Sequence, residues 1–285
     1  MSIAMANREK DFSVIIRGLY DSEVGEVIKN LNKKYECEIV YSTWDTWSPK
    51  EARLPKKVKI VLSTDPGPGP IQNLNRQIKL VDAALKRCTN EKIFMCRSDI
   101  NFDTIPFFRY QEDAVFWSSI MSVIYGHPCP EAALMEREFF MAGTKREYYC
   151  RFGDWYHMGS KVNIADLYAP CTEQEIVQFK QAFPDYMRNG NPQTACIEQF
   201  LFHRYMSKRA NDYIEFILNH VRIMDISELN GKITKDIYKN KRDVEYHNSS
   251  KHKKLLHILR TNRTRSAQSW QLSYKANRPR TPRST

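Results

Sequence analysis

The stretch KIFMCRSDINFD, residues 92–103, decides the predicted fold. Its apolar first half predicts a buried strand, which ends abruptly at Arg97, Ser98 and Asp99. A strand that delivers the carboxylate of Asp99 and the amide of Asn101 to its carboxyl end places oxygen atoms where open α/β sheets bind ligands. Such oxygens suit Mg²⁺ or Mn²⁺ bridging phosphates. The alternative is an ordinary strand end with a solvated turn, because turns also favour Asp and Asn.

The chain before this stretch alternates between strand and helix patterns. Strands are predicted at residues 12–19, 37–44, 59–65 and 92–98, and helices at 21–35 and 73–88. Asp21 or Ser22 is the expected N-cap of the first helix, and the PGPGP run at 66–70 ends the third strand. Residues 115–125 fit a strand or a short helix, and helical spacing returns at 161–168, 173–183 and 194–210. This order predicts a doubly wound α/β fold.

Several common enzyme classes are disfavoured by missing motifs. No G-x-G-x-x-G follows the first strand, and neither a G-x-x-x-x-G-K-[ST] nor a G-x-S-x-G motif occurs. The seven cysteines are scattered without a C-x-x-C pair, which favours reduced thiols in the cytosol over a zinc or disulfide framework. The sequence also lacks a signal-peptide pattern and an apolar run long enough to span a membrane.

The net charge of +11 is concentrated at the C-terminus. Residues 232–285 hold 15 Lys and Arg against 3 Asp and Glu, whereas residues 1–231 hold 29 against 30. We therefore predict a body at 1–230 and a basic extension at 231–285, with a short amphipathic helix at 251–260 and a mobile tail beyond it. Basic residues interleaved with Trp270 and Tyr274 suit an anionic membrane surface or single-stranded nucleic acid. A solvated tail without a partner is the third interpretation.

Polar residues also end the earlier predicted strands. Arg17 and Gly18 end the first, Asp45 follows the second, and Asp65 ends the third. Arg76 lies near the start of the next helix, where a guanidinium and free backbone N–H groups favour a diphosphate. Solvated surface roles are the alternatives, and for Asp65 a turn-initiating role is about equally favoured.

A second group of candidates lies in the C-terminal half of the body. Asp154 stands among Trp155, Tyr156 and His157, and aromatic surroundings raise the pKa of a carboxyl and suit it to act as a base. His157 is a candidate metal ligand, with a structural or stacking role as the favoured alternative. Glu198 begins a predicted helix and is a second candidate base, unless it only complements the helix dipole.

The ordered series of these segments resembles the WavE-type lipopolysaccharide synthesis family over roughly residues 12–206. The segments that carry the resemblance are VIIRG at 14–18, YSTWD at 41–45, LSTDPGPG at 62–69, NLNRQI at 73–78, RSDINF at 97–102, GDWYHMG at 153–159 and IEQFLF at 197–202. The family is assigned to the GT-A glycosyltransferases. The resemblance therefore implies a Rossmann-like mixed sheet flanked by helices and a transferase that uses a nucleotide sugar.

The resemblance also implies roles for the candidates. The segment from Ser98 to Asn101 stands where GT-A enzymes carry their D-x-D metal motif, with Asn101 in place of the second acid. The metal ligands it implies are Asp99 and Asn101, His157 remains a further candidate from its own chemistry, and the implied cofactor is Mn²⁺ or Mg²⁺. The nucleotide-sugar site it implies comprises Arg17, Gly18, Asp45, Asp65, Arg76, Arg97, Ser98 and Asp99. Asp154 matches the DW motif and is the first candidate for the base that activates the acceptor. Glu198 is the second candidate.

The sequence thus predicts a cytoplasmic glycosyltransferase at the inner membrane face. Its expected partners are a nucleotide-sugar donor, a lipopolysaccharide or other surface-glycan acceptor that is lipid-linked, and anionic lipids that bind the basic extension. The alternative is a nucleic-acid-binding protein that uses the basic arm. That alternative explains the charge but not the ordered acidic residues at the strand ends.

Overall fold

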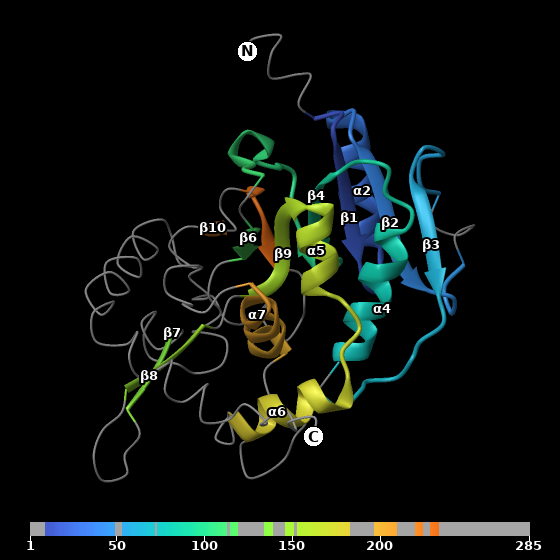
Figure 1. Ribbon diagram of the computed structural model, residues 1–285. Coiled ribbons are helices and arrows are strands. Elements are labelled where there is room, and N and C mark those ends of the chain that lie inside the picture. The colour runs from blue at the N-terminus through green and yellow to red at the C-terminus, as the bar shows by residue number, and fades with distance from the viewer. Residues whose placement is uncertain are drawn as a thin grey trace, which may run out of the picture.

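The computed structural model describes residues 9–48, 53–71, 73–112, 115–118, 134–138, 146–150, 153–182, 197–209, 220–224 and 229–233. Its centre is a mixed seven-stranded sheet in the order β10-β6-β9-β4-β1-β2-β3, flanked by helices (Figure 1). The strands are β1 (Phe12–Arg17), β2 (Glu38–Trp44), β3 (Lys59–Ser63), β4 (Lys92–Arg97), β6 (Val115–Ser118), β9 (Gly153–Ser160) and β10 (Val221–Met224). The predicted α/β class is confirmed.

The helices lie on both faces of the sheet. They are α2 (Ser22–Lys34), α4 (Leu74–Leu85), α5 (Lys161–Leu167), α6 (Glu173–Ala182) and α7 (Ile197–Ser207), with a 3₁₀ turn η1 (Phe107–Arg109). Two further strand pairs stand outside the main sheet: β5 (Ile100–Asn101) with β11 (Lys232–Ile233), and β7 (Leu134–Glu138) with β8 (Arg146–Cys150). Asp21 caps α2, because its carboxylate accepts a hydrogen bond from the backbone N–H of Val24 at 2.8 Å.

The strand order places a topological switch point between β1 and β4. From β1 the chain proceeds through β2 to β3 on one side, and it then crosses over to β4 on the other. The strands β3, β2, β1 and β4 are all parallel, so their carboxyl ends share one edge of the sheet. Ligands of open α/β sheets bind outside this edge, at such a switch point.

Strand β9 is antiparallel to both of its neighbours, β4 and β6. This strand was not predicted from the sequence, in which residues 153–160 stood out only for their chemistry. Its direction brings its first residues to the carboxyl edge of β4, because the register pairs Cys96 with Tyr156 and Met95 with His157.

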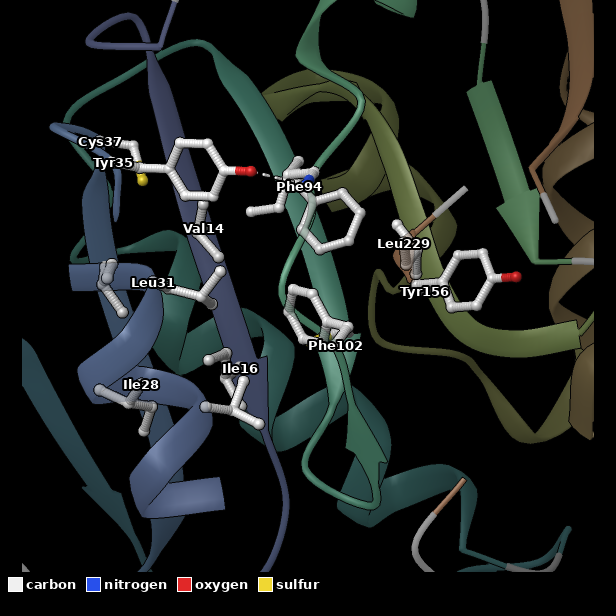
Figure 2. Packing of buried hydrophobic residues seen from close by; sticks show 14 of the residues in the cluster. Val14, Ile16, Ile28, Leu31, Tyr35, Cys37, Phe94, Phe102, Tyr156 and Leu229 are labelled. Atoms are coloured by element: carbon white, nitrogen blue, oxygen red, sulfur yellow. Dashed lines mark hydrogen bonds between the residues drawn. The ribbon is translucent and has the colours of Figure 1, made fainter. Parts of the chain in front are cut away.

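The two faces of the sheet pack against different helices. Ile15 and Met95 point into a cluster with α4, α5, α6 and α7, whereas Val14 and Phe94 point into a cluster with α2. Figure 2 shows the second cluster, in which the rings of Phe94 and Phe102 have centroids 5.7 Å apart. Because both faces are covered, the central strands carry consecutive apolar residues, VII at 14–16 in β1 and IFMC at 93–96 in β4, instead of alternating with polar ones.

The basic extension begins with a strand that pairs with the body. Lys232 is in register with Asn101 and Ile233 with Ile100, and the backbone N–H of Thr104 donates to the carbonyl of Leu229 at 3.1 Å. The predicted helix at 251–260 and the tail beyond it lie outside the described residues, as do residues 119–125 of the segment predicted as a strand or a short helix.

The amino edge of the sheet, opposite the switch-point edge, is tied together by Glu38. Its carboxylate accepts hydrogen bonds from Ser13, from Lys59, and from the backbone N–H and hydroxyl of Thr89 at 2.9 and 3.0 Å. Burial raises the pKa of Glu38, but these donors together outweigh burial and hold it below its ordinary value of 4.5. The carboxylate therefore links three strands and the loop before β4.

We expect this cluster to make folding sensitive to acid. A carboxyl whose pKa is lower in the folded state adds stability that is complete above about pH 4.5 and is lost as the pH falls further. Glu38→Gln should lower the free energy of unfolding by about 1–3 kcal/mol at pH 7. In urea titrations from pH 7 to pH 3, the difference between the two proteins should shrink below pH 4.5, and a constant difference would contradict this role.

Candidate functional site

The carboxyl ends of β1 and β4 meet at the switch point. Arg17 and Arg97 are register partners on adjacent parallel strands, and the backbone N–H of Ser98 donates to the carbonyl of Arg17 at 2.8 Å. The structure therefore brings together four residues that the sequence predicted for one binding site, namely Arg17, Gly18, Arg97 and Ser98.

Gly18 permits this close approach of the two strand ends. Its φ of +134° is a conformation that residues with a side chain rarely adopt, and a Cβ atom there would stand 2.3 Å from Oγ of Ser98. Its backbone N–H donates to the carbonyl of Ser42 at 3.1 Å, and its carbonyl accepts from the hydroxyl of Tyr41 at 3.2 Å. The backbone at the end of β1 is thus held in place from two sides.

Asp99 is held by Arg97 in a bidentate ion pair. Nε of Arg97 donates to Oδ1 at 2.9 Å and Nη2 donates to Oδ2 at 2.5 Å. Both side chains are partly exposed, Arg97 by 22% and Asp99 by 25%. Both carboxylate oxygens of the predicted metal ligand therefore already accept hydrogen bonds from a guanidinium.

The other two predicted metal ligands do not join Asp99. Ser98 and Asp99 form a turn, so the extended backbone that would place Asp99 and Asn101 on one side is absent, and Asn101 pairs in β5. His157 lies in mid-strand opposite Met95, fully buried, with Nε2 2.9 Å from the hydroxyl of Tyr168. No group of three or more His, Cys, Asp or Glu that could hold a metal occurs within the described part of the chain. The structure therefore does not group the three predicted metal ligands.

Arg17 lies beneath the strand ends, only 4% exposed. Its Nη2 donates to the hydroxyl of Tyr168 at 3.2 Å, and its guanidinium carbon stands 5.3 Å from the centroid of that ring. Tyr168 also contacts His157, so one tyrosine at the end of α5 joins the end of β1 and the middle of β9. A guanidinium remains protonated when buried, so Arg17 places a positive charge under the switch point.

A second pair of predicted residues meets at the end of β3. Nε and Nη2 of Arg76, near the start of α4, donate to the carboxylate of Asp65 at 2.9 and 2.7 Å. The guanidinium of Arg76 and the backbone N–H of Gly67 hold the pKa of Asp65 below its usual range. This pair lies three strand spacings from β4, about 14 Å along the same edge. Asp45, at the end of β2, accepts from Thr64 at 2.6 Å.

The two predicted bases lie on described backbone, but their side chains are outside the described part of the structure. Asp154 is the second residue of β9. Because Tyr156 pairs with Cys96, the antiparallel register carries Asp154 past the end of β4, to the edge where Asp99 lies. Glu198 is the second residue of α7, the helix next to α5. The backbone thus places Asp154 at the switch-point edge and Glu198 on a helix that packs next to α5.

Two features of this edge had not been predicted. Tyr168 contacts Arg17 from 151 positions away, and nothing near either residue in the sequence indicates the contact. Tyr20 and Trp47 follow β1 and β2 and stack with ring centroids 4.5 Å apart. Their positions directly after two strand ends were a usable signal for this second feature.

Comparisons with known proteins add no assignment to this geometry. A scan against models of protein families found no match, and a search of curated proteins found no significant match either. Among the residues that the structure describes, no helix combines the length and the apolarity needed to cross a membrane.

Proposed function

We propose that the chain is a glycosyltransferase with a GT-A-like fold, which transfers a sugar from a nucleoside-diphosphate sugar to lipopolysaccharide or another surface glycan. The observation that carries the proposal is the pairing of Arg17 with Arg97 at the switch point, where Gly18 follows the first and Ser98 and Asp99 follow the second. A mixed sheet flanked by helices supports the fold. The sequence resemblance to the WavE-type family supports the class of acceptor.

The charges at this edge suit a diphosphate leaving group. Negative charge develops on the diphosphate as the sugar departs, and preorganised positive groups lower the barrier by stabilising it. Arg97 is exposed enough to contact a phosphate, and Arg17 adds a second positive charge beneath it. A guanidinium also matches phosphate geometry by donating two parallel hydrogen bonds.

The acceptor needs a base if the reaction inverts the sugar. A carboxylate at the same edge, on the far side of β4 from β1, is suited to take the proton of the acceptor hydroxyl. Asp154 has this position along the backbone of β9. We assign it that role ahead of Glu198, whose helix packs on the face of the sheet that α5 covers.

The acceptor is proposed to be lipid-linked, with the enzyme in the cytoplasm at the inner membrane face. The basis for this part is the excess of positive charge in residues 232–285. Each Lys or Arg near an anionic leaflet adds about 1 kcal/mol of attraction, so a segment of this composition can hold a protein at a membrane surface.

A panel of nucleotide sugars in thermal unfolding tests the proposal. In buffer with Mg²⁺ and Mn²⁺, one donor should raise the melting temperature by several degrees, because a ligand at 100 times its Kd adds about 2.7 kcal/mol. Asp82→Asn, on the solvent side of α4, is the control and should keep the shift. No shift with any nucleotide sugar, together with salt-dependent binding of single-stranded RNA, would favour the nucleic-acid-binding alternative.

A further inference from the structure

The near-neutral charge of residues 1–231 is unevenly distributed over the body. Its 29 Lys and Arg and 30 Asp and Glu almost cancel in number. Five of the basic residues nevertheless gather at the amino edge of β3, the outermost strand on that side of the sheet (Figure 1). We call these five residues the basic corner: Lys56, Lys57, Lys59, Lys86 and Arg87.

A turn presents the first two members of the basic corner to solvent. The backbone N–H of Val58 donates to the carbonyl of Pro55 at 3.0 Å. Lys56 and Lys57 occupy the two middle positions of this turn, and both are exposed. Val58 is only 7% exposed and packs in the core on the α2 side, so the turn is fixed to the body. The two lysines are thus held at the surface directly before β3.

The other members reach the same place from β3 and α4. Nζ of Lys59, the first residue of β3, donates to the carbonyl of Arg87 at 3.2 Å. This contact joins the start of β3 to the end of α4, where Lys86 and Arg87 are both exposed. Because Lys59 lies only two residues beyond Lys57, the turn and the end of α4 meet at one corner of the body.

Acidic side chains neutralise only two of these five charges. Glu38 accepts a hydrogen bond from Lys59, and Asp82 forms a salt bridge with Lys86 at 2.7 Å. Five positive charges against two negative ones leave the basic corner with a net charge of +3. The body therefore carries a positive surface at the amino edge of the sheet, in addition to the basic extension.

The remaining three side chains have no ion-pair partner in the described part of the chain. Lys56, Lys57 and Arg87 form neither a salt bridge nor a side-chain hydrogen bond there. Glu36 interacts with Lys57 only at longer range, and its carboxylate is paired with Lys10 at 2.7 Å. Three neighbouring positive charges without partners attract an anionic surface.

We propose that the basic corner docks the body of the protein on an anionic membrane, as a second contact beside the basic extension. This inference rests on the membrane location in the proposed function and names the surface of the folded body that meets the lipid. Each Lys or Arg near an anionic leaflet raises the affinity about fivefold, and no pocket is needed. No exposed aromatic side chain is described at the basic corner, whereas single-stranded nucleic acid is bound by stacking on such rings.

The position of the basic corner suits this role. It lies at the amino ends of the parallel strands, and the switch point lies at their carboxyl ends. The six residues of β4 separate the two edges by about 20 Å. A bilayer held at the basic corner therefore leaves the switch-point edge open to a soluble nucleotide sugar. Two contacts on one chain also bind more tightly than either alone, because the first raises the effective concentration for the second.

Sedimentation of the full chain with vesicles of phosphatidylserine and phosphatidylcholine measures this contact. The triple variant Lys56→Gln, Lys57→Gln, Arg87→Gln should bind about 10- to 100-fold more weakly, because three charges are lost. The variant Lys56→Arg, Lys57→Arg, Arg87→Lys keeps every charge and should bind as the unchanged chain does. Lys29→Gln with Lys208→Gln removes charges from surface positions on α2 and after α7. It should weaken binding by less than about threefold, because charges beyond a Debye length of the membrane are screened.

Chemical modification tests the basic corner independently of the extension. A reagent that acetylates lysine should modify Lys56 and Lys57 several-fold more slowly when phosphatidylserine vesicles are present. Lys29 and Lys208 should react at the same rate with and without vesicles, and vesicles of phosphatidylcholine alone should protect none of the four. Mass spectrometry of the digested chain gives the rate at each lysine.

Unchanged vesicle binding by the triple variant, with its fold established by circular dichroism, would overturn the inference. Equal acetylation of Lys56 and Lys57 with and without phosphatidylserine vesicles would do the same. Single-stranded RNA that binds the full chain and not the triple variant would assign the basic corner to nucleic acid instead. The nucleotide-sugar panel separates these failures from that of the proposed function. A donor shift without vesicle protection leaves the transferase and removes the docking surface, whereas protection without any donor shift removes only the transferase.

Discussion

Gly18→Ala is expected to lower the free energy of unfolding by about 2–4 kcal/mol and to weaken binding of the nucleotide-sugar donor at least tenfold. The new methyl group meets two obstacles. The φ of +134° is strained for any residue with a side chain, and the Cβ would stand 2.3 Å from Oγ and 3.2 Å from Cβ of Ser98. Rotation of the hydroxyl relieves the first contact only, so the ends of β1 and β4 must separate.

Comparison with Gly67 separates the cost of backbone strain from the cost of the clash with Ser98. Gly67 also has a positive φ, +82°, but no atom lies within 4 Å of the position that a Cβ would take there, so Gly67→Ala should cost about 1 kcal/mol from backbone strain alone. The double variant Gly18→Ala, Ser98→Gly should recover the part due to the clash. Equal effects of Gly18→Ala and Gly67→Ala in urea unfolding would show that the strand ends are not in close contact.

The first half of the fold follows directly from local sequence. The strands β1, β2, β3 and β4 and the helices α2 and α4 were predicted, with ends that differ by a few residues, because the strands are short apolar runs and the helices have one apolar face. Once strands and helices alternate, parallel pairing puts the strand ends at one edge. Arg17, Gly18, Arg97 and Ser98 were therefore placed together correctly without knowledge of any tertiary contact.

Strand β9 was not predictable by the same reasoning. Trp155, Tyr156, His157 and Met158 are all buried, so the segment lacks the alternation that marks a half-exposed strand. Its partner β4 ends more than 50 positions earlier in the chain, and antiparallel insertion between two parallel neighbours has no local signal. His157 was consequently considered as a metal ligand beside the favoured structural or stacking role, and its buried ring contacts Tyr168 at the end of α5.

The ion pairs of the site could not be predicted from the sequence either. A spacing of two residues suggested that Asp99 and Asn101 share a side, but the turn at Ser98 and Asp99 redirects the carboxylate toward Arg97. Whether a strand-end carboxylate meets a cation or a guanidinium depends on a turn conformation that single residue types do not specify. The same limit applied to Asp65 and Arg76, which were both selected but not recognised as partners.

Asp154→Asn is the second large effect that we expect. If Asp154 takes the proton of the acceptor hydroxyl, the amide cannot replace it, and kcat should fall about 10²- to 10⁴-fold. The backbone position of Asp154 past the end of β4 is the physical basis for this expectation. Donor affinity should stay within about fivefold, because the donor diphosphate is assigned to Arg97 on the neighbouring strand, and the loss of one hydrogen bond from Asp154 costs about 1 kcal/mol or less. Radiolabelled sugar transfer gives kcat, and calorimetric titration gives donor affinity.

Two control variants and a pH profile test whether Asp154 is the base. Glu198→Gln should leave most of the activity if Asp154 is the base, and Asp82→Asn, an exposed carboxylate paired with Lys86, should leave all of it. A general base that must be ionised also produces an acidic limb in the pH dependence of kcat/KM, which should disappear in Asp154→Asn. A raised KM for the acceptor with unchanged kcat would mean that Asp154 binds sugar and takes no proton, which is the outcome expected if the reaction retains the configuration of the sugar.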